Sequence, residues 1–206
     1  MTAGSPLRLQ PYGDRAILIE TDQPLALRDE LTALADPAIE FVVPAARTVL
    51  VGFDPDRLDL AAVLGRATDA RPARVDSPEA PEPLTLTVRY DGPDLATVAD
   101  QTGLSVAEVI RRHHEAEYTV AFCGFSPGFG YLTGLPGELR LPRLDRPRTR
   151  VPAGSVAIAD EYTGVYPRPS PGGWRLLGQT EAELFDHRRN PPALLVPGRL
   201  VRFVPA

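Results

Sequence analysis

The chain has 206 residues, of which 43% are hydrophobic and 24% charged, a composition that indicates a folded protein of one or two domains and excludes disordered and collagenous classes. Its formal net charge of -5 argues against a general nucleic-acid surface, because nonspecific affinity comes from neutralising phosphates. All 22 basic residues are arginine, so a P-loop, a Schiff-base enzyme and a protein kinase are excluded, since each needs a lysine.

The N-terminal part predicts a small α+β domain over residues 1–76. Residues 15–20 form an apolar strand pattern, and residues 24–35 carry leucines at helical spacing. Two further strands are expected at residues 41–43 and 48–53, followed by a second helix at residues 58–70. Strands that alternate with helices in this way indicate a sheet with one face covered.

A proline-rich stretch at residues 77–83 predicts a linker, and residues 84–206 predict a second domain. That domain opens with a strand at residues 84–90 and two helices at residues 94–101 and 105–116. The remainder is divided into short segments by glycine and proline, a pattern typical of a β-barrel or a β-sandwich.

Location and cysteine usage are also constrained by the sequence. The first ten residues lack a basic segment followed by an apolar one, and no apolar run approaches a membrane span, so we expect a cytoplasmic protein. The single cysteine, Cys123, permits no internal disulfide and is predicted to be a small buried strand residue. With one cysteine and three scattered histidines, we expect no metal site.

Two motifs imitate known functional patterns. The helix pair around Gly103, with Ser105 and Glu108 as a capping box, is similar to a helix-turn-helix, but its second helix carries mainly apolar residues and favours packing over DNA reading. The segment 124–128 fits the G-x-S-x-G pattern of serine hydrolases. Pro127, however, has no backbone N–H to donate to an oxyanion, so we exclude that class.

Three other features each allow two interpretations. Four aromatic residues interleaved with glycines at 122–131 predict either a binding groove or a packed barrel corner. Five arginines within residues 140–150 predict either an anion site stiffened by prolines or a solvated charged run. Trp174, after the turn at residues 171–173, either lines a pocket or anchors the barrel core.

Of the histidines, His113 and His114 end a helix, and His187 is expected at the surface.

Linked motifs across nearly the whole chain carry a specific resemblance. They are His114-x-x-x-Tyr118-x-Val120, Gly124-Phe125-x-Pro127-Gly128-Phe129-x-Tyr131-Leu132, Pro142-Arg143, Pro147-Arg148, Val151-Pro152-x-Gly154-Ser155-Val156, Gly164-Val165-Tyr166-Pro167 and Pro171-Gly172-Gly173-Trp174. Together they resemble the family of the 5-oxoprolinase B subunit, also named KipI and allophanate hydrolase subunit 1. Two departures from its pattern are Tyr162, in place of glutamine, and Arg199, in place of an aspartate, so we assign no acid-base or metal role at the second position.

The resemblance implies a ferredoxin-like N-terminal domain and a cyclophilin-like β-barrel C-terminal domain. It also implies two partners, the A subunit of the complex and the homologous C subunit, with which the family cleaves 5-oxoproline to glutamate using ATP. The chain alone is expected to be inactive. Some relatives instead inhibit a sporulation histidine kinase, and the allophanate name points to a urea-derived amide; the sequence does not separate these alternatives.

On this resemblance we expect the site residues to serve a small anionic substrate. Arg143, Arg148 and Arg150 are expected to hold carboxylate or phosphoryl oxygens, and His114 and Ser155 to supply hydrogen bonds. Of these, His114, Arg148 and Ser155 are the predicted catalytic residues. The substrate-binding set also includes four aromatic residues: Phe125, Phe129, Tyr166 and Trp174.

Overall fold

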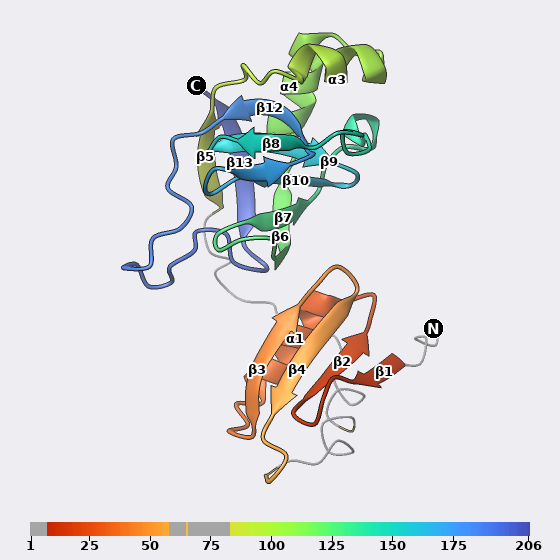
Figure 1. Ribbon diagram of the computed structural model, residues 1–206, viewed down its shortest axis with the longest axis vertical. Coiled ribbons are helices and arrows are strands. Elements are labelled where there is room, and N and C mark those ends of the chain that lie inside the picture. Colours follow the sequence, from red (N-terminus) through yellow and green to blue (C-terminus); the bar gives the residue numbers. More distant parts are fainter. Residues whose placement is uncertain (1–7, 58–64, 66–82) are drawn as a thin grey trace. The chain divides into compact units, whose positions relative to one another are not determined.

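The computed structural model describes residues 8–57, 65 and 83–206. The chain divides into two compact units, Met1–Glu79 and Ala80–Ala206, whose described parts run from red to orange and from yellow-green to blue in Figure 1. The linker predicted at residues 77–83 lies outside the described residues except for Pro83, and the helix predicted at residues 58–70 lies outside them except for Gly65. None of the described helices is long and apolar enough to cross a membrane.

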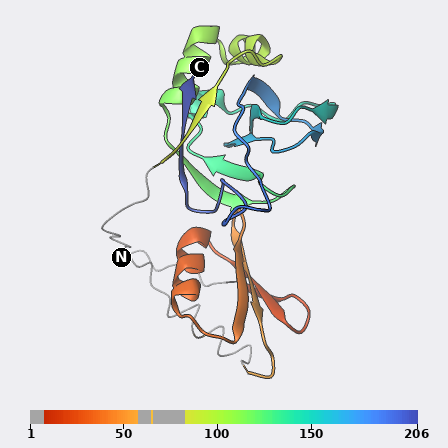
Figure 2. The same cartoon turned by 90° about the vertical axis from the view of Figure 1, so that its left-hand side faces the viewer.

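The first unit contains an antiparallel sheet of four strands in the order β1-β2-β4-β3. Its elements are β1 (Arg8–Pro11), β2 (Ala16–Glu20), α1 (Pro24–Ala33), β3 (Ile39–Pro44) and β4 (Thr48–Phe53). The inward side chains of β2 and β4 pack against Leu27 and Leu31 of α1, which covers one face of the sheet (Figures 1 and 2). The three strands and the helix predicted in this part of the chain are thus confirmed, whereas β1 was not predicted because its four residues include only one aliphatic side chain, Leu9.

The second unit is built on a seven-stranded sheet in the order β12-β9-β10-β7-β6-β13-β5. Its strands are β5 (Leu84–Val88), β6 (Tyr118–Cys123), β7 (Gly130–Thr133), β9 (Ser155–Ala159), β10 (Tyr162–Val165), β12 (Arg175–Gln179) and β13 (Leu200–Pro205). A separate two-stranded sheet pairs β8 (Arg148–Val151) with β11 (Ser170–Gly172).

The large sheet is nearly closed into a barrel. Its last strand in sequence, β13, runs parallel to its first, β5, and the two lie side by side in Figure 2. Just beyond β5, Arg89 exchanges two backbone hydrogen bonds of 2.9 Å with Gln179 of β12, which joins the two ends of the sheet. The barrel interpretation of the sequence is therefore confirmed, and the side chains inside it form the larger core of this unit.

Two helices, α3 (Leu95–Thr102) and α4 (Val106–Glu115), follow β5, as predicted, and a short 3-10 helix, η1 (Gly137–Leu139), follows β7. The chain turns between α3 and α4 at Gly103, where φ is +69°. Ser105 caps α4, since its Oγ accepts a hydrogen bond of 3.2 Å from the Glu108 backbone N–H. Val109 is fully buried and Ile110 packs against the barrel core. This burial confirms that the second helix is a packing element.

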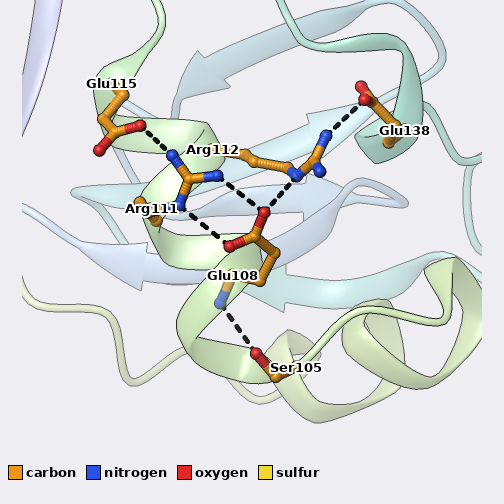
Figure 3. Close-up of polar contacts among 6 residues, drawn as sticks. All are labelled: Ser105, Glu108, Arg111, Arg112, Glu115 and Glu138. Atoms are coloured by element: carbon orange, nitrogen blue, oxygen red, sulfur yellow. Dashed lines mark hydrogen bonds and ion pairs between the residues drawn. The ribbon is translucent and has the colours of Figure 1, made fainter.

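The polar face of α4 carries a network of ion pairs (Figure 3). The Glu108 carboxylate, expected to close a capping box, instead accepts hydrogen bonds from Arg111 at 2.8 Å and from Arg112 at 2.8 Å. Arg111 also reaches Glu115, and Arg112 reaches Glu138 of η1, so the network ties the helix to the loop after β7. Hydrogen bonds from these two arginines lower the pKa of Glu108 to about 2.

Candidate functional site

The aromatic residues predicted to bind substrate lie together outside the barrel core. The Phe129 ring is centred 5.3 Å from the rings of Phe125, Tyr166 and Trp174, in each case edge to face. Phe129, Tyr166 and Trp174 are buried and form a second, smaller core. Of the four aromatic residues predicted to bind substrate, three are therefore packed, and Phe125 is the one that is largely exposed, at 57%.

Phe125 stands in a strained loop between β6 and β7. Its φ is +66°, a left-handed conformation that a bulky residue rarely adopts. Short backbone hydrogen bonds hold the loop, including one of 2.7 Å from Ser126 N–H to the Gly124 carbonyl. The Ser126 hydroxyl is buried and has no partner in the described part of the chain. The loop thus presents one aromatic ring to solvent at a cost in backbone strain.

Cys123, at the end of β6, was predicted to be buried and is exposed. That prediction is wrong because the residue is the last of its strand, where the sheet gives way to the loop. Its thiol donates a hydrogen bond of 3.3 Å to the Leu195 carbonyl, and partial desolvation raises the pKa of the thiol.

The predicted arginines differ sharply in how they are held. Arg143 is exposed and lies 3.9 Å from the equally exposed Asp160. Arg150 is exposed, and no hydrogen bond or ion pair of its side chain is found within the described ranges. Arg148 is different, because it donates a hydrogen bond of 2.6 Å to Asp94 and its side chain is only 29% exposed. A pre-arranged guanidinium is therefore observed at Arg148 alone of these three.

Arg148 lies on the side of the aromatic cluster that carries the Tyr166 hydroxyl. It pairs across the small sheet with Gly172, and a methyl group added to Gly172 would lie 2.3 Å from the Tyr166 hydroxyl oxygen. Burial raises the pKa of Tyr166, while a backbone hydrogen bond from Trp174 and the charges of Arg143 and Arg148 oppose this rise. These contacts bring one predicted cation and two predicted aromatics into one region.

The other two predicted catalytic residues have weaker connections to this region. Ser155 is buried at the start of β9, and its carbonyl accepts a hydrogen bond of 3.0 Å from the Tyr166 backbone N–H. His114 is half-buried on α4, and the described residues offer its ring no hydrogen bond. The structure thus places Ser155 next to Tyr166 but joins His114 to neither.

Its neighbour His113 is fully buried in the barrel. Its Nε2 lies 3.0 Å from Thr163 Oγ1, and its Nδ1 lies 2.8 Å from the Tyr90 hydroxyl. The hydroxyl proton of Thr163 is donated to the Ala157 carbonyl, so the hydroxyl oxygen can only accept a hydrogen bond from the histidine. We therefore place the ring proton on Nε2, and Nδ1 accepts a hydrogen bond from the Tyr90 hydroxyl. Burial, with a smaller effect from His114, lowers the pKa of His113 to about 3.

His113 is therefore a neutral, structural histidine that was not singled out from the sequence. The adjacent pair of histidines gave no signal to tell which would be buried. His187, by contrast, is exposed as predicted. Within the described residues, no group of three or more histidine, cysteine, aspartate or glutamate side chains is arranged to hold a metal ion.

Comparisons with known proteins place the chain in a family. The family model described as carboxyltransferase domain, subdomain C and D, matches residues 7–195. The 5-oxoprolinase B subunit of Escherichia coli O157:H7 is 40% identical over 208 aligned residues, which cover 94% of this chain and 93% of that protein. This chain belongs to the 5-oxoprolinase B-subunit family.

Solved structures of other proteins are also similar to this chain. The crystal structure of TTHA0988 matches with a TM-score of 0.82 and 38% identity, covering 93% of this chain but 40% of that one. The chain therefore spans about two fifths of that longer relative. The Kluyveromyces lactis urea carboxylase matches with a TM-score of 0.69 and 19% identity over 97% of this chain and 22% of that chain, a likeness of fold alone.

Proposed function

We propose that this chain is the B subunit of a cytoplasmic, ATP-dependent complex that hydrolyses 5-oxoproline to glutamate, acting with two partners, the homologous C subunit of the complex plus its A subunit. The observation that carries the proposal is the 40% identity to the E. coli B subunit over nearly the full length of both chains. On the same basis we propose a ferredoxin-like first domain over residues 1–76, and a cyclophilin-like barrel over residues 84–206. The names of these relatives, each a subunit, support an assembly rather than a free-standing enzyme.

The reaction needs activation because a lactam carbonyl is stabilised by amide resonance. In the proposed route the terminal phosphoryl group of ATP moves to the lactam oxygen and ADP leaves. Water then adds to the lactam carbon, the ring C–N bond breaks with protonation of nitrogen, and a second water releases phosphate from the resulting acyl phosphate. Negative charge accumulates on oxygen in these steps, so fixed N–H donors and guanidinium groups stabilise them.

We assign the anion-binding part of this task to the region around Arg148. Its guanidinium is held by a largely buried carboxylate, and its charge acts on the Tyr166 hydroxyl. Arg143 and Arg150 are exposed, so in this proposal they act only when a partner protein covers them. Phe125, which is exposed on a strained loop, is the aromatic residue we expect to contact that partner.

Ser155 and His114 keep hydrogen-bonding roles in the proposal. Support is stronger for Ser155, which is buried beside Tyr166, than for His114, which has no polar partner in the described structure. Phe129 serves to hold the Tyr166 and Trp174 rings in place, because it packs edge-on against both.

The test is reconstitution from purified proteins. The A and C subunits are incubated with 5-oxoproline and ATP, with and without this chain, and glutamate and ADP are measured together. The proposal predicts glutamate formation that requires all three proteins, with ADP released in step. Equal glutamate formation without this chain would exclude it from the activity. Inhibition of a sensor histidine kinase by the chain, with no glutamate from any mixture, would favour the regulatory alternative instead.

A further inference from the structure

Asp94 is a buried carboxylate whose two oxygens are both in use. It is only 7% exposed. Its Oδ1 accepts the hydrogen bond of 2.6 Å from Arg148 Nη2, and its Oδ2 accepts one of 2.7 Å from the backbone N–H of Leu176. Asp94 directly precedes α3, where an aspartate normally caps the helix, yet its side chain makes no capping hydrogen bond. The carboxylate is therefore directed to Arg148 and β12 instead of to its own helix.

The same arrangement leaves one nitrogen of Arg148 without an acceptor. Nη1 is buried and has no hydrogen-bond partner within the described structure. The guanidinium is planar and rigid, so a contact that fixes Nη2 also fixes the direction of the Nη1 protons. A buried charged donor without an acceptor costs free energy, and an acceptor that binds next to it recovers that free energy. Part of the Arg148 side chain remains open to solvent, which gives an acceptor a route to it.

The unpartnered nitrogen of Arg148 belongs to the region around the Tyr166 hydroxyl. Arg148 faces Gly172 across the small sheet, and Gly172 lies against the Tyr166 hydroxyl. Asp94 is anchored to the neighbouring strand β12 twice, since its backbone N–H also donates a hydrogen bond of 3.2 Å to the Leu176 carbonyl. Trp174 precedes that strand by one residue. The carboxylate thus connects the guanidinium to the strand that follows the aromatic cluster.

We propose that Asp94 is a positioning residue, which holds Arg148 so that Nη1 donates a hydrogen bond to the carboxylate of a small anionic ligand. This inference rests on the proposed function and deepens it, because it assigns Arg148 to the carboxylate of the substrate and not to the lactam or a phosphate. Asp94 acts through Arg148 and does not touch the ligand, since both of its oxygens already have donors.

Three probes separate the carboxylate from the lactam. 5-Oxoproline carries both groups, cyclopentanecarboxylate carries the carboxylate on a similar ring, and pyrrolidinone carries the lactam alone. Each is titrated into the purified full chain, with the fluorescence of the single tryptophan, Trp174, as the signal and calorimetry as a second measure. The variants are Asp94→Asn and, as a matched control, Glu117→Gln, which removes an exposed carboxylate paired with Arg202 on the same unit.

Asp94→Asn should weaken binding of both carboxylates roughly tenfold, the usual size for one charge-assisted hydrogen bond, and leave pyrrolidinone binding unchanged. Glu117→Gln should change none of the three affinities. Carboxylate affinities equal to those of the wild type in Asp94→Asn would overturn the inference, as would a wild-type chain that binds neither carboxylate. A uniform loss of affinity for all three probes would also overturn it, because that is the result of a purely structural role.

Two further measurements keep the test independent of folding and of the overall reaction. Nitrogen NMR of the Arg148 guanidinium should show slow rotation in the wild type and fast rotation in Asp94→Asn. If Asp94→Asn does not fold, Arg148→Lys retains the charge opposite Asp94 but lacks the second nitrogen, and it should show the same selective loss. Because cyclopentanecarboxylate has no lactam to hydrolyse, its binding decides the inference even if reconstitution shows no turnover of 5-oxoproline.

Discussion

The buried histidine of the barrel makes stability depend on pH in a way that can be isolated. The pKa of His113 is lowered by burial to about 3, whereas an unfolded histidine titrates near its ordinary pKa of about 6.5. Between these two values the unfolded chain binds one more proton than the folded chain. The contribution of this residue to the unfolding free energy is therefore constant above about pH 6.5. It falls by about 1.4 kcal/mol per pH unit as the pH decreases toward the folded pKa.

The magnitude over a usable range follows directly. Between about pH 6.5 and about pH 5 the wild type should lose about 2 kcal/mol of unfolding free energy through this residue. Glu108 does not interfere, because its pKa is lowered to about 2 from an ordinary value of 4.5, so its effect begins below that range. His113→Asn should start less stable by about 2 kcal/mol through lost hydrogen bonds to Tyr90 and Thr163, but its stability should be nearly flat over the same range.

Urea unfolding followed by Trp174 fluorescence reports on the unit that contains His113. His187→Asn, at an exposed position, should retain the pH dependence of the wild type. If His113→Asn loses as much stability on acidification as the wild type does, the buried neutral histidine is not the cause and the assignment of its protonation is wrong.

Three further changes test the packing and the charges around the site. Glu108→Gln should lower the melting temperature at neutral pH, because two arginines of α4 hold this carboxylate ionised. It should also remove a loss of stability that the wild type shows below about pH 4.5. Thermal unfolding at several pH values measures both effects. Gly178→Ala places a methyl group 2.3 Å from the Arg89 carbonyl oxygen, where the ends of the barrel sheet meet, and should lower the unfolding free energy in urea by more than about 2 kcal/mol. Gly137→Ala, which has open space around it, should be nearly neutral. Equal effects of the two substitutions would show that the sheet ends are not tightly packed. Phe129→Ala should cost about 3 kcal/mol or more, and Phe125→Ala, at an exposed and strained position, should leave the melting temperature within a few degrees of the wild type.

Local patterns predicted most elements that carry a clear period. The leucines of α1 and the apolar runs of β2 and β4 could be found because burial on one face imposes that period. The strand β1 could not, because it is an edge strand of four residues, each exposed or only partly buried. A barrel was expected, but the pairing that joins the two ends of its sheet was not, since the hydrogen bonds between Arg89 and Gln179 join residues far apart in the chain.

The aromatic part of the site was predicted only as alternatives. Phe129 and Trp174 each suited a binding surface or a packed core, because large aromatic residues serve in both, and the structure buries them together with Tyr166. The arginine run, in contrast, gave no means to tell Arg148 from Arg150, because the difference lies in a carboxylate from another part of the chain. Asp94 was predicted only as the first residue of a helix, and the contact with β12 shows that its oxygens serve elsewhere.

The proposed function gives Arg148 the role of the positioned cation in the anion site of a lactam-hydrolysing complex. Its most direct test is glutamate formation from 5-oxoproline and ATP by the reconstituted complex, with Arg148→Lys in this chain and Arg202→Ala as an exposed control. We predict that Arg148→Lys lowers kcat/KM by at least about tenfold, the size of one lost charge-assisted hydrogen bond, while Arg202→Ala keeps the wild-type value. Undiminished turnover by a folded Arg148→Lys complex would contradict the account.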